Sequence, residues 1–249
     1  MNKGGVNISK KVKGIMSIFF LSISFYMMLT TKYMHALGDY VLEFISLKSW
    51  TGEYSGTHLT IFYFSALTIL GLYLVRKYAM HELGIRTRNL LFSFIAFVTI
   101  LSIVTNITAI NVKKNSDGLL SVGFNSKNTR IEYKSESMEY TEFKAKIEMK
   151  NYGNKRKEFY LAIGNPFYRE EDTEHIGIFT KDGKKATFSL NGYETKTFEI
   201  NLDEYNIKGG SLSQSGGGNG GIEEIFLTNV QGNAIRLDSN NFFGIEISR

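Results

Sequence analysis

The sequence predicts a membrane protein of two parts, in which a transmembrane region of three α-helices is followed by an all-β sandwich. Three stretches of the first half contain no Asp, Glu, Lys or Arg: residues 14–31, 54–75 and 89–112. About 20 apolar residues, each rising 1.5 Å, span the hydrocarbon core of a bilayer, so each stretch is long enough for a helical span. From about residue 117 the pattern changes to the two-residue alternation of strands.

Charge is divided unevenly between the two halves. Residues 1–112 hold 10 Lys and Arg against 4 Asp and Glu, whereas residues 113–249 hold 19 against 20. The formal charge of +5 therefore comes from segments beside the predicted spans. We interpret it as a mark of membrane topology, and it does not indicate nucleic-acid binding.

The basic residues also predict an orientation. Eight lie before the first span or between the second and third, and only Lys32 and Lys48 lie in the other loop. By the positive-inside rule, residues 1–13 form a cytoplasmic tail and residues 76–88 a cytoplasmic loop. Three spans over residues 14–112 then place residues 113–249 outside, as the soluble domain of a multi-pass protein of the cell membrane. Lys113 and Lys114, just after the third span, count against this orientation.

The first span is expected to stay in the mature protein. Its 18-residue apolar run is longer than a usual signal-peptide core, and residues 31–38 lack a small-x-small cleavage site. The chain has no cysteine, which excludes disulfides, thiolate metal sites and lipoprotein attachment. Its richness in Lys, Asn and Ile indicates a bacterial origin.

Polar residues within the spans are few. His58 lies near the outer end of the second span, where an interfacial position is the simplest interpretation and proton or ion handling is the alternative. The third span carries a stripe of small or weakly polar residues at helical spacing. Such a stripe favours close helix packing over a pore. Its members are Thr99, Ser102, Asn106 and Ala109.

Residues 33–50 are predicted to form an amphipathic helix outside the membrane. Apolar residues recur at helical spacing along one side, and polar residues such as Asp39 and Glu43 lie opposite. The helix would rest on the bilayer or support the outer domain.

The second half is predicted to be a β-sandwich. In residues 140–150, Phe143, Ala145, Ile147 and Met149 alternate with charged residues, which is typical of a half-buried strand. Turn pairs such as Asp182-Gly183 separate similar segments. The expected strands cover residues 119–124, 129–135, 140–150, 157–163, 175–180, 185–190, 193–201, 222–229, 233–238 and 242–248.

This half resembles the immunoglobulin-like domains of bacterial surface proteins. The resemblance rests on the strand–turn–strand pattern of residues 146–161 and on the run from Phe188 to Ile200. It implies an immunoglobulin-like sandwich, although the Cys–Trp–Cys pattern of antibody domains is absent.

Two segments of the outer half are candidate sites. Residues 209–221 hold seven glycines without the motif of a phosphate-binding loop, which predicts a mobile loop or one that orders on a partner. A dense acidic cluster offers oxygen ligands for Ca²⁺, although a solvated loop is the more usual meaning of such a run. The cluster comprises Glu170, Glu171, Asp172, Glu174 and His175.

The function predicted from these observations is binding. No cofactor or catalytic motif is recognised, so we expect a membrane-anchored extracytoplasmic binding or accessory protein rather than an enzyme. Its expected partners are the bilayer and a membrane or envelope protein, and not nucleic acid. One alternative is a subunit of a membrane transport or secretion complex, for which His58 and the third-span stripe are the support. Another is an extracellular hydrolase, for which His175 is the available imidazole of the outer half.

Overall fold

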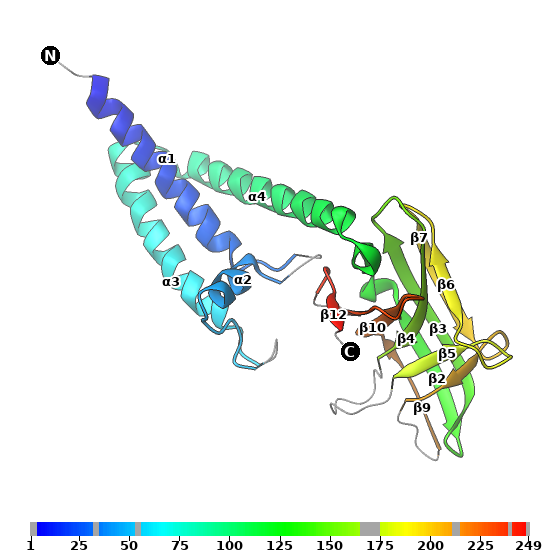
Figure 1. The fold of residues 1–249 in the computed structure, drawn as a ribbon. Helices are drawn as coiled ribbons and strands as arrows, with labels where there is room; N and C mark the ends of the chain where they lie inside the picture. The colour runs from blue at the N-terminus through cyan, green and yellow to red at the C-terminus, as the bar shows by residue number, and fades with distance from the viewer. Residues whose placement is uncertain are drawn as a thin grey trace. The chain divides into compact units, whose positions relative to one another are not determined.

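The computed structural model describes residues 4–31, 35–52, 56–164, 175–210, 215–238 and 241–247. These residues belong to two compact units, Met1–Thr108 and Ala109–Arg249. Figure 1 shows helices in the first unit and mostly strands in the second. We call them the helical unit and the β unit.

The helical unit is built from α1 (Gly4–Tyr26), α2 (Leu37–Phe44), α3 (Leu59–Leu74) and most of α4 (Thr87–Asn115). Helix α3 continues directly into a π-helix, η1 (Val75–Glu82). Helix α1 packs along α3, and their backbones approach closely because Gly71 carries no side chain: a Cβ there would lie 3.0 Å from Cα of Leu21. A small core joins α1, η1 and the start of α4, with Ile18, Leu21, Val75, Ala79 and Leu90 buried.

Among the described residues, two helices are long and apolar enough to cross a membrane, and not the three that we expected. They are Leu59–Glu82 and Thr87–Asn115. The helix of the first predicted span is not apolar over a sufficient length, because α1 ends at Tyr26 and contains Lys10, Lys11 and Lys13. Its uncharged helical part, residues 14–26, extends roughly 20 Å, which is shorter than a hydrocarbon core of about 30 Å.

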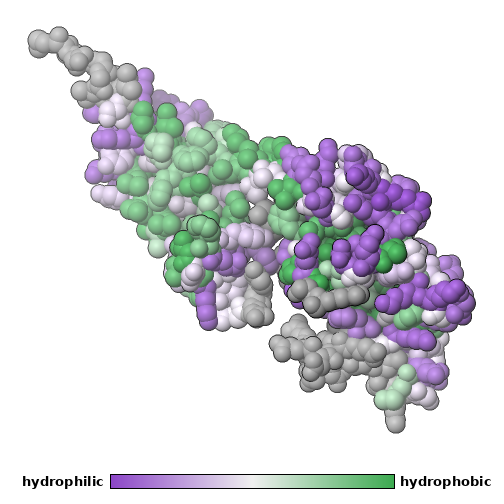
Figure 2. All heavy atoms as spheres, viewed as in Figure 1, coloured by the Kyte–Doolittle hydropathy of each residue, from purple (hydrophilic) through white to green (hydrophobic). Residues whose placement is uncertain are grey.

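Both candidate spans present apolar side chains to their surroundings. The most apolar stretch of α4 buries none of its residues within the chain. On the face in Figure 2, hydrophobic residues gather over the helical unit and hydrophilic residues over the β unit. Soluble monomers rarely expose apolar surface of this extent, so this surface is suited to lipid or to other helices.

The amphipathic segment at 33–50 is helical over a shorter range than predicted. Among its described residues, only Leu37–Phe44 are helical. Asp39 and Leu42 face inward, at 1% and 4% exposed, whereas Glu43 of the predicted polar side is exposed. The apolar side faces outward, with Phe44 90% exposed.

The β unit contains two antiparallel sheets. The first comprises β1 (Val122–Phe124), β2 (Arg130–Glu136), β3 (Glu139–Asn151), β7 (Thr195–Asn201) and β9 (Ser215–Gly221). Its order is β1-β3-β2-β9, with β7 also paired to β3. Two short 3₁₀ turns, η2 (Gly118–Ser121) and η3 (Ser126–Asn128), flank β1.

The second sheet is formed by seven strands around β4 (Lys157–Ile163). Its order is β12-β11-β10-β4-β5-β8, and β6 also pairs with β4. The other strands are β5 (Ile176–Phe179), β6 (Thr187–Leu190), β8 (Asn206–Lys208), β10 (Glu224–Thr228), β11 (Ala234–Asp238) and β12 (Ile245–Ile247).

Both sheets contribute to one hydrophobic core. Phe143 and Ile147 of β3 are buried together with Phe159 and Leu161 of β4. The alternation in residues 140–150 therefore assigned the buried side correctly. All ten predicted strands are present at least in part, although residues 119–121 of the first belong to the 3₁₀ turn η2. Two further strands, β8 and β9, were not predicted. The immunoglobulin-like fold stays a prediction.

Candidate binding site

The glycine-rich segment contains a strand where we predicted a loop. Residues Ser215–Gly221 form β9, which pairs antiparallel with β2 from Glu136 opposite Ser215 to Arg130 opposite Gly221. The hydroxyl of Ser135 also donates to the carbonyl of Gly216 at 3.4 Å. Glycine is unfavourable in strands, because it loses more backbone freedom on folding than other residues. Pairing along all of β2 offsets this cost.

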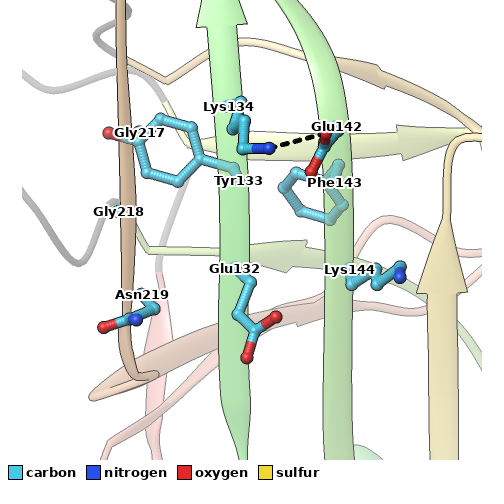
Figure 3. Close-up of a pocket in the computed structure, with 9 residues that line it drawn as sticks. All are labelled: Glu132, Tyr133, Lys134, Glu142, Phe143, Lys144, Gly217, Gly218 and Asn219. Carbon is cyan, nitrogen blue, oxygen red and sulfur yellow. Dashed lines mark hydrogen bonds and ion pairs between the residues drawn. The ribbon is translucent and has the colours of Figure 1, made fainter.

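An aromatic side chain on β2 covers the backbone of β9. Tyr133 lies opposite Gly218 in the register, and its ring extends toward Gly217 and Gly218 in Figure 3. An aromatic ring beside a glycine on the neighbouring strand supplies packing that glycine lacks. The Tyr133 ring in turn meets the Tyr140 ring edge to face, with centroids 5.8 Å apart.

The other edge of β9 has no strand partner in the part of the chain that the structure describes. Exposed edges are usually blunted by charged residues or proline, because their free N–H and C=O groups can pair with another chain. β9 has neither. The strand β7 forms an edge of the same sheet and has the same length, but it carries Lys196 and Glu199. β1 is also an edge strand without charge or proline, but it has three residues, so β9 is the longest edge of this kind among the described strands of the sheet.

A hollow of about 500 Å³ lies across β9, β2 and β3. Its charges balance one another: Lys134 pairs with Glu142 at 2.7 Å, and Glu132 lies opposite Lys144. The hollow therefore lacks the net charge that would attract a small ion. Figure 3 shows its lining: Glu132, Tyr133, Lys134, Glu142, Phe143, Lys144, Gly217, Gly218 and Asn219.

Comparison with known protein families, curated proteins and solved structures gives no match.

The predicted acidic cluster lies mostly outside the described residues. Glu170, Glu171, Asp172 and Glu174 lie outside the described ranges. His175 is exposed and its ring stacks on Phe226, with centroids 3.8 Å apart. The described ranges contain no group of three or more His, Asp or Glu side chains that could hold a metal ion.

The residues of the predicted packing stripe of the third span become more buried toward the C-terminal end of α4. Thr99 is exposed, Ser102 and Asn106 are half-buried, and Ala109 is buried. The side-chain oxygen of Asn106 is buried without a hydrogen-bond partner among the described residues. The proposed packing role of the stripe stays a prediction.

A buried polar cluster in the helical unit was missed by the sequence analysis. His58 precedes the first residue of α3, and its Nε2 lies 2.6 Å from Oδ1 of Asp39. The hydroxyl of Thr60 donates to the same oxygen at 2.5 Å. The other carboxylate oxygen of Asp39 is buried without a partner in the described part of the chain. His58 is thus bound to a carboxylate and is not simply an interfacial side chain.

The loop before α3 closes over this cluster. The Trp50 ring stacks on the His58 ring, with centroids 4.1 Å apart and planes at 10°. The N–H of Leu59 donates to the carbonyl of Ser49 at 2.8 Å, and the Ser49 hydroxyl donates to Glu43 at 2.9 Å. These contacts fix α2 against the start of α3 and leave its apolar side exposed. Local sequence patterns do not reveal the cluster, because its members come from three separate segments.

Proposed function

We propose that this chain is a membrane-anchored binding protein whose β unit binds an extended segment of a partner protein. The partner segment would add a strand to the free edge of β9. The observation that carries the proposal is the seven-residue edge without charge or proline beside a hollow of balanced charge. Strand addition of this kind obtains affinity from main-chain hydrogen bonds and specificity from side-chain pockets.

The hollow also suggests the chemistry of the partner segment. Side chains of successive strand residues alternate between the two faces of a sheet. On one face the added strand would lie nearest the Tyr133 ring, which extends toward β9, and on the other it would lie nearest the paired charges beside Glu132. We therefore expect a segment of alternating apolar and polar residues. A second copy of β9 would fit less well, because its glycines bring no side chains into the hollow.

The anchoring part of the proposal rests on the two long apolar helices. We infer that α3 with η1, and α4, cross the membrane as a hairpin. The exposed side of α2, with Val41, Phe44 and Ile45, is suited to the interface between lipid and water. The Asp39–His58 cluster would then serve to hold α2 in that position.

The positive-inside rule still favours an extracytoplasmic β unit. A two-helix hairpin places residues 35–58 and the β unit on one side, opposite the connection at residues 83–86. The side chains of Lys13 and Lys77 both lie over the Tyr78 ring, at 5.9 and 5.3 Å from its centroid. The basic residues of α1 thus lie at the same end as those of residues 76–88, which supports this orientation whether or not α1 crosses the membrane.

A photocrosslinking amino acid at Asn219 of β9 tests the binding edge in intact cells. We expect an adduct with another protein from this position, and none from the matched position Thr197 on the charged edge β7. Because a Cβ at Gly221 would meet no atom within 4 Å, Gly221→Lys adds a charged side chain to the edge without a clash. Such a charge should disfavour pairing with another strand. This variant should abolish the adduct, while Thr197→Lys should preserve it. Adducts only between copies of this chain, or equal adducts from both edges, would contradict the proposal.

A further inference from the structure

The end of the helical unit that carries the basic residues contains a second hollow. It lies between the end of η1 and the start of α4, and both elements belong to the same unit. The apolar side chains of Met80 and Ile85 form part of its wall. The remaining lining residues are Arg76, His81, Gly84, Arg86 and Thr87.

The turn between η1 and α4 shapes this hollow. Gly84 has a φ of +65°, a conformation that side-chain-bearing residues rarely adopt. The N–H of Gly84 donates to the carbonyl of Met80 at 2.9 Å, and the N–H of Ile85 donates to that of Ala79 at 3.1 Å. This closed turn brings Arg86 to the same hollow as Arg76 within ten residues of chain.

The positive charge at this end is not neutralised by the described part of the protein. Glu82 is the single acidic residue between residues 56 and 115, whereas Arg76, Lys77, Arg86 and Arg88 lie in its immediate neighbourhood. The described residues include no ion pair for these four side chains. In the β unit, by contrast, Lys134 and Lys146 both pair with glutamates.

The basic hollow adjoins the apolar surface of the two candidate spans. Leu72 lies one helical turn before Arg76 and is 55% exposed, and Leu91 lies one turn after Thr87 and is 58% exposed. A ligand held by the arginines would therefore have exposed apolar side chains within one turn. Such an arrangement matches a molecule with an anionic head and acyl chains.

We propose that this hollow binds the phosphate headgroup of an anionic phospholipid, with Arg76 and Arg86 as its main contacts. Guanidinium groups suit phosphate because they can donate two parallel hydrogen bonds. Basic pockets between helices at the membrane surface are suited to anionic headgroups. The exposed apolar side chains beside the hollow, Leu72 and Leu91, favour a lipid over free phosphate as the ligand. This inference rests on the proposed membrane insertion of the helices.

The test uses the full-length protein in detergent, to which phosphatidylglycerol, phosphatidylcholine or inorganic phosphate is added. Lipid binding is measured by native mass spectrometry and by the shift in the thermal unfolding temperature. We expect phosphatidylglycerol to bind more tightly than phosphatidylcholine, and inorganic phosphate not to compete at millimolar concentration. The variant Arg76→Gln/Arg86→Gln should bind phosphatidylglycerol roughly 10- to 30-fold more weakly, because each basic residue near a membrane surface contributes about 1 kcal/mol.

The variant Lys10→Gln/Lys11→Gln is the matched control, because it removes two charges from α1 outside the hollow. It should retain most of the preference for phosphatidylglycerol. Equal binding of both lipids by the wild type, equal losses in the two variants, or full competition by inorganic phosphate would each overturn the proposal. Extraction of cell membranes with alkaline carbonate separately tests insertion. Release of the protein at that step would contradict the proposed anchoring rather than the lipid site alone.

Discussion

His58 donates a hydrogen bond from Nε2 to the buried carboxylate of Asp39 at 2.6 Å, although the two residues are 19 positions apart. Asp39 is 1% exposed, and Thr60 donates to the same oxygen. A buried carboxylate is stable only when donors or charges compensate it. The pair therefore joins α2 to the start of α3, and its removal should loosen the loop that lies between them.

The variant Asp39→Asn should destabilise the helical unit by about 1.5–3 kcal/mol, because hydrogen bonds to a charged acceptor are worth about that much. Trp50 is the single tryptophan of the chain, and its ring stacks on His58. We expect its fluorescence emission to shift to longer wavelength as the loop opens in detergent-solubilised protein. Glu82→Gln changes an exposed carboxylate in the same unit and should alter neither stability nor emission. An unchanged emission in Asp39→Asn would contradict this assignment.

Asn151 organises the turn between β3 and β4. Its buried amide donates to the carbonyl oxygens of Lys155 at 2.8 Å and Asn191 at 2.9 Å, and its oxygen accepts from the N–H of Gly153 at 3.0 Å. Asn151→Ala leaves these backbone groups unpaired and should lower the free energy of unfolding of the β unit by about 2–4 kcal/mol. Denaturant unfolding measures the loss. Asn128→Ala, at an exposed position, should cost less than about 1 kcal/mol; equal losses would argue against the role of Asn151.

Two adjacent lysines at the end of α4 should differ strongly in their effect on the β unit. The Lys113 side chain is buried, donates to the carbonyl of Phe243 at 3.0 Å and lies over the Phe242 ring. Lys113→Ala removes this packing and should cost about 2 kcal/mol. It should also increase hydrogen exchange in β12. Lys114→Ala changes an exposed neighbour that lies over the Tyr193 ring, and it should cost less than about 1 kcal/mol. Similar effects of the two variants would refute the docking of Lys113.

The hairpin at residues 180–184 should weaken in acid. Hydrogen bonds from Thr180 and Lys184 hold the pKa of Asp182 below its usual value of 3.8. Because the folded pKa is the lower one, this contribution to stability is present above pH 3.8 and is lost as the pH falls through the folded pKa. Hydrogen exchange at Gly183 should therefore become faster as the pH falls below 3.8. The variant Asp182→Asn should not show this acid-dependent increase. If the variant showed the same increase in acid, a group other than Asp182 would be responsible.

The fold of the β unit could largely be predicted from local sequence. Alternation in residues 140–150 fixes which side chains face the core, since a strand places successive residues on opposite faces. Strand β9 was not predicted, because its glycines provide no alternation of apolar and polar side chains. What holds it is pairing with β2, which lies about 80 residues earlier.

The number of spans and the faces of α2 were predicted less well. An uncharged run does not reveal where its helix ends, and α1 ends at Tyr26 before the run is complete. In α2 the predicted apolar side is exposed at Val41 and Phe44, but the predicted polar side is divided, because Asp39 is buried and Glu43 is exposed. Periodicity did not predict the burial of Asp39, which is tolerated because His58 and Thr60 compensate its carboxylate inside the unit.

The sequence by itself determined two parts, one apolar and helical and one alternating and mostly β, together with the concentration of basic charge beside the apolar runs. These properties depend on composition and on spacings of two to four residues. Tertiary structure alone decided the pairing of Asp39 with His58, the position of β9 at the end of its sheet and the gathering of Arg76 and Arg86 at one hollow. Each of these depends on a chain reversal or on long-range packing, and local periodicity carries no information about such contacts.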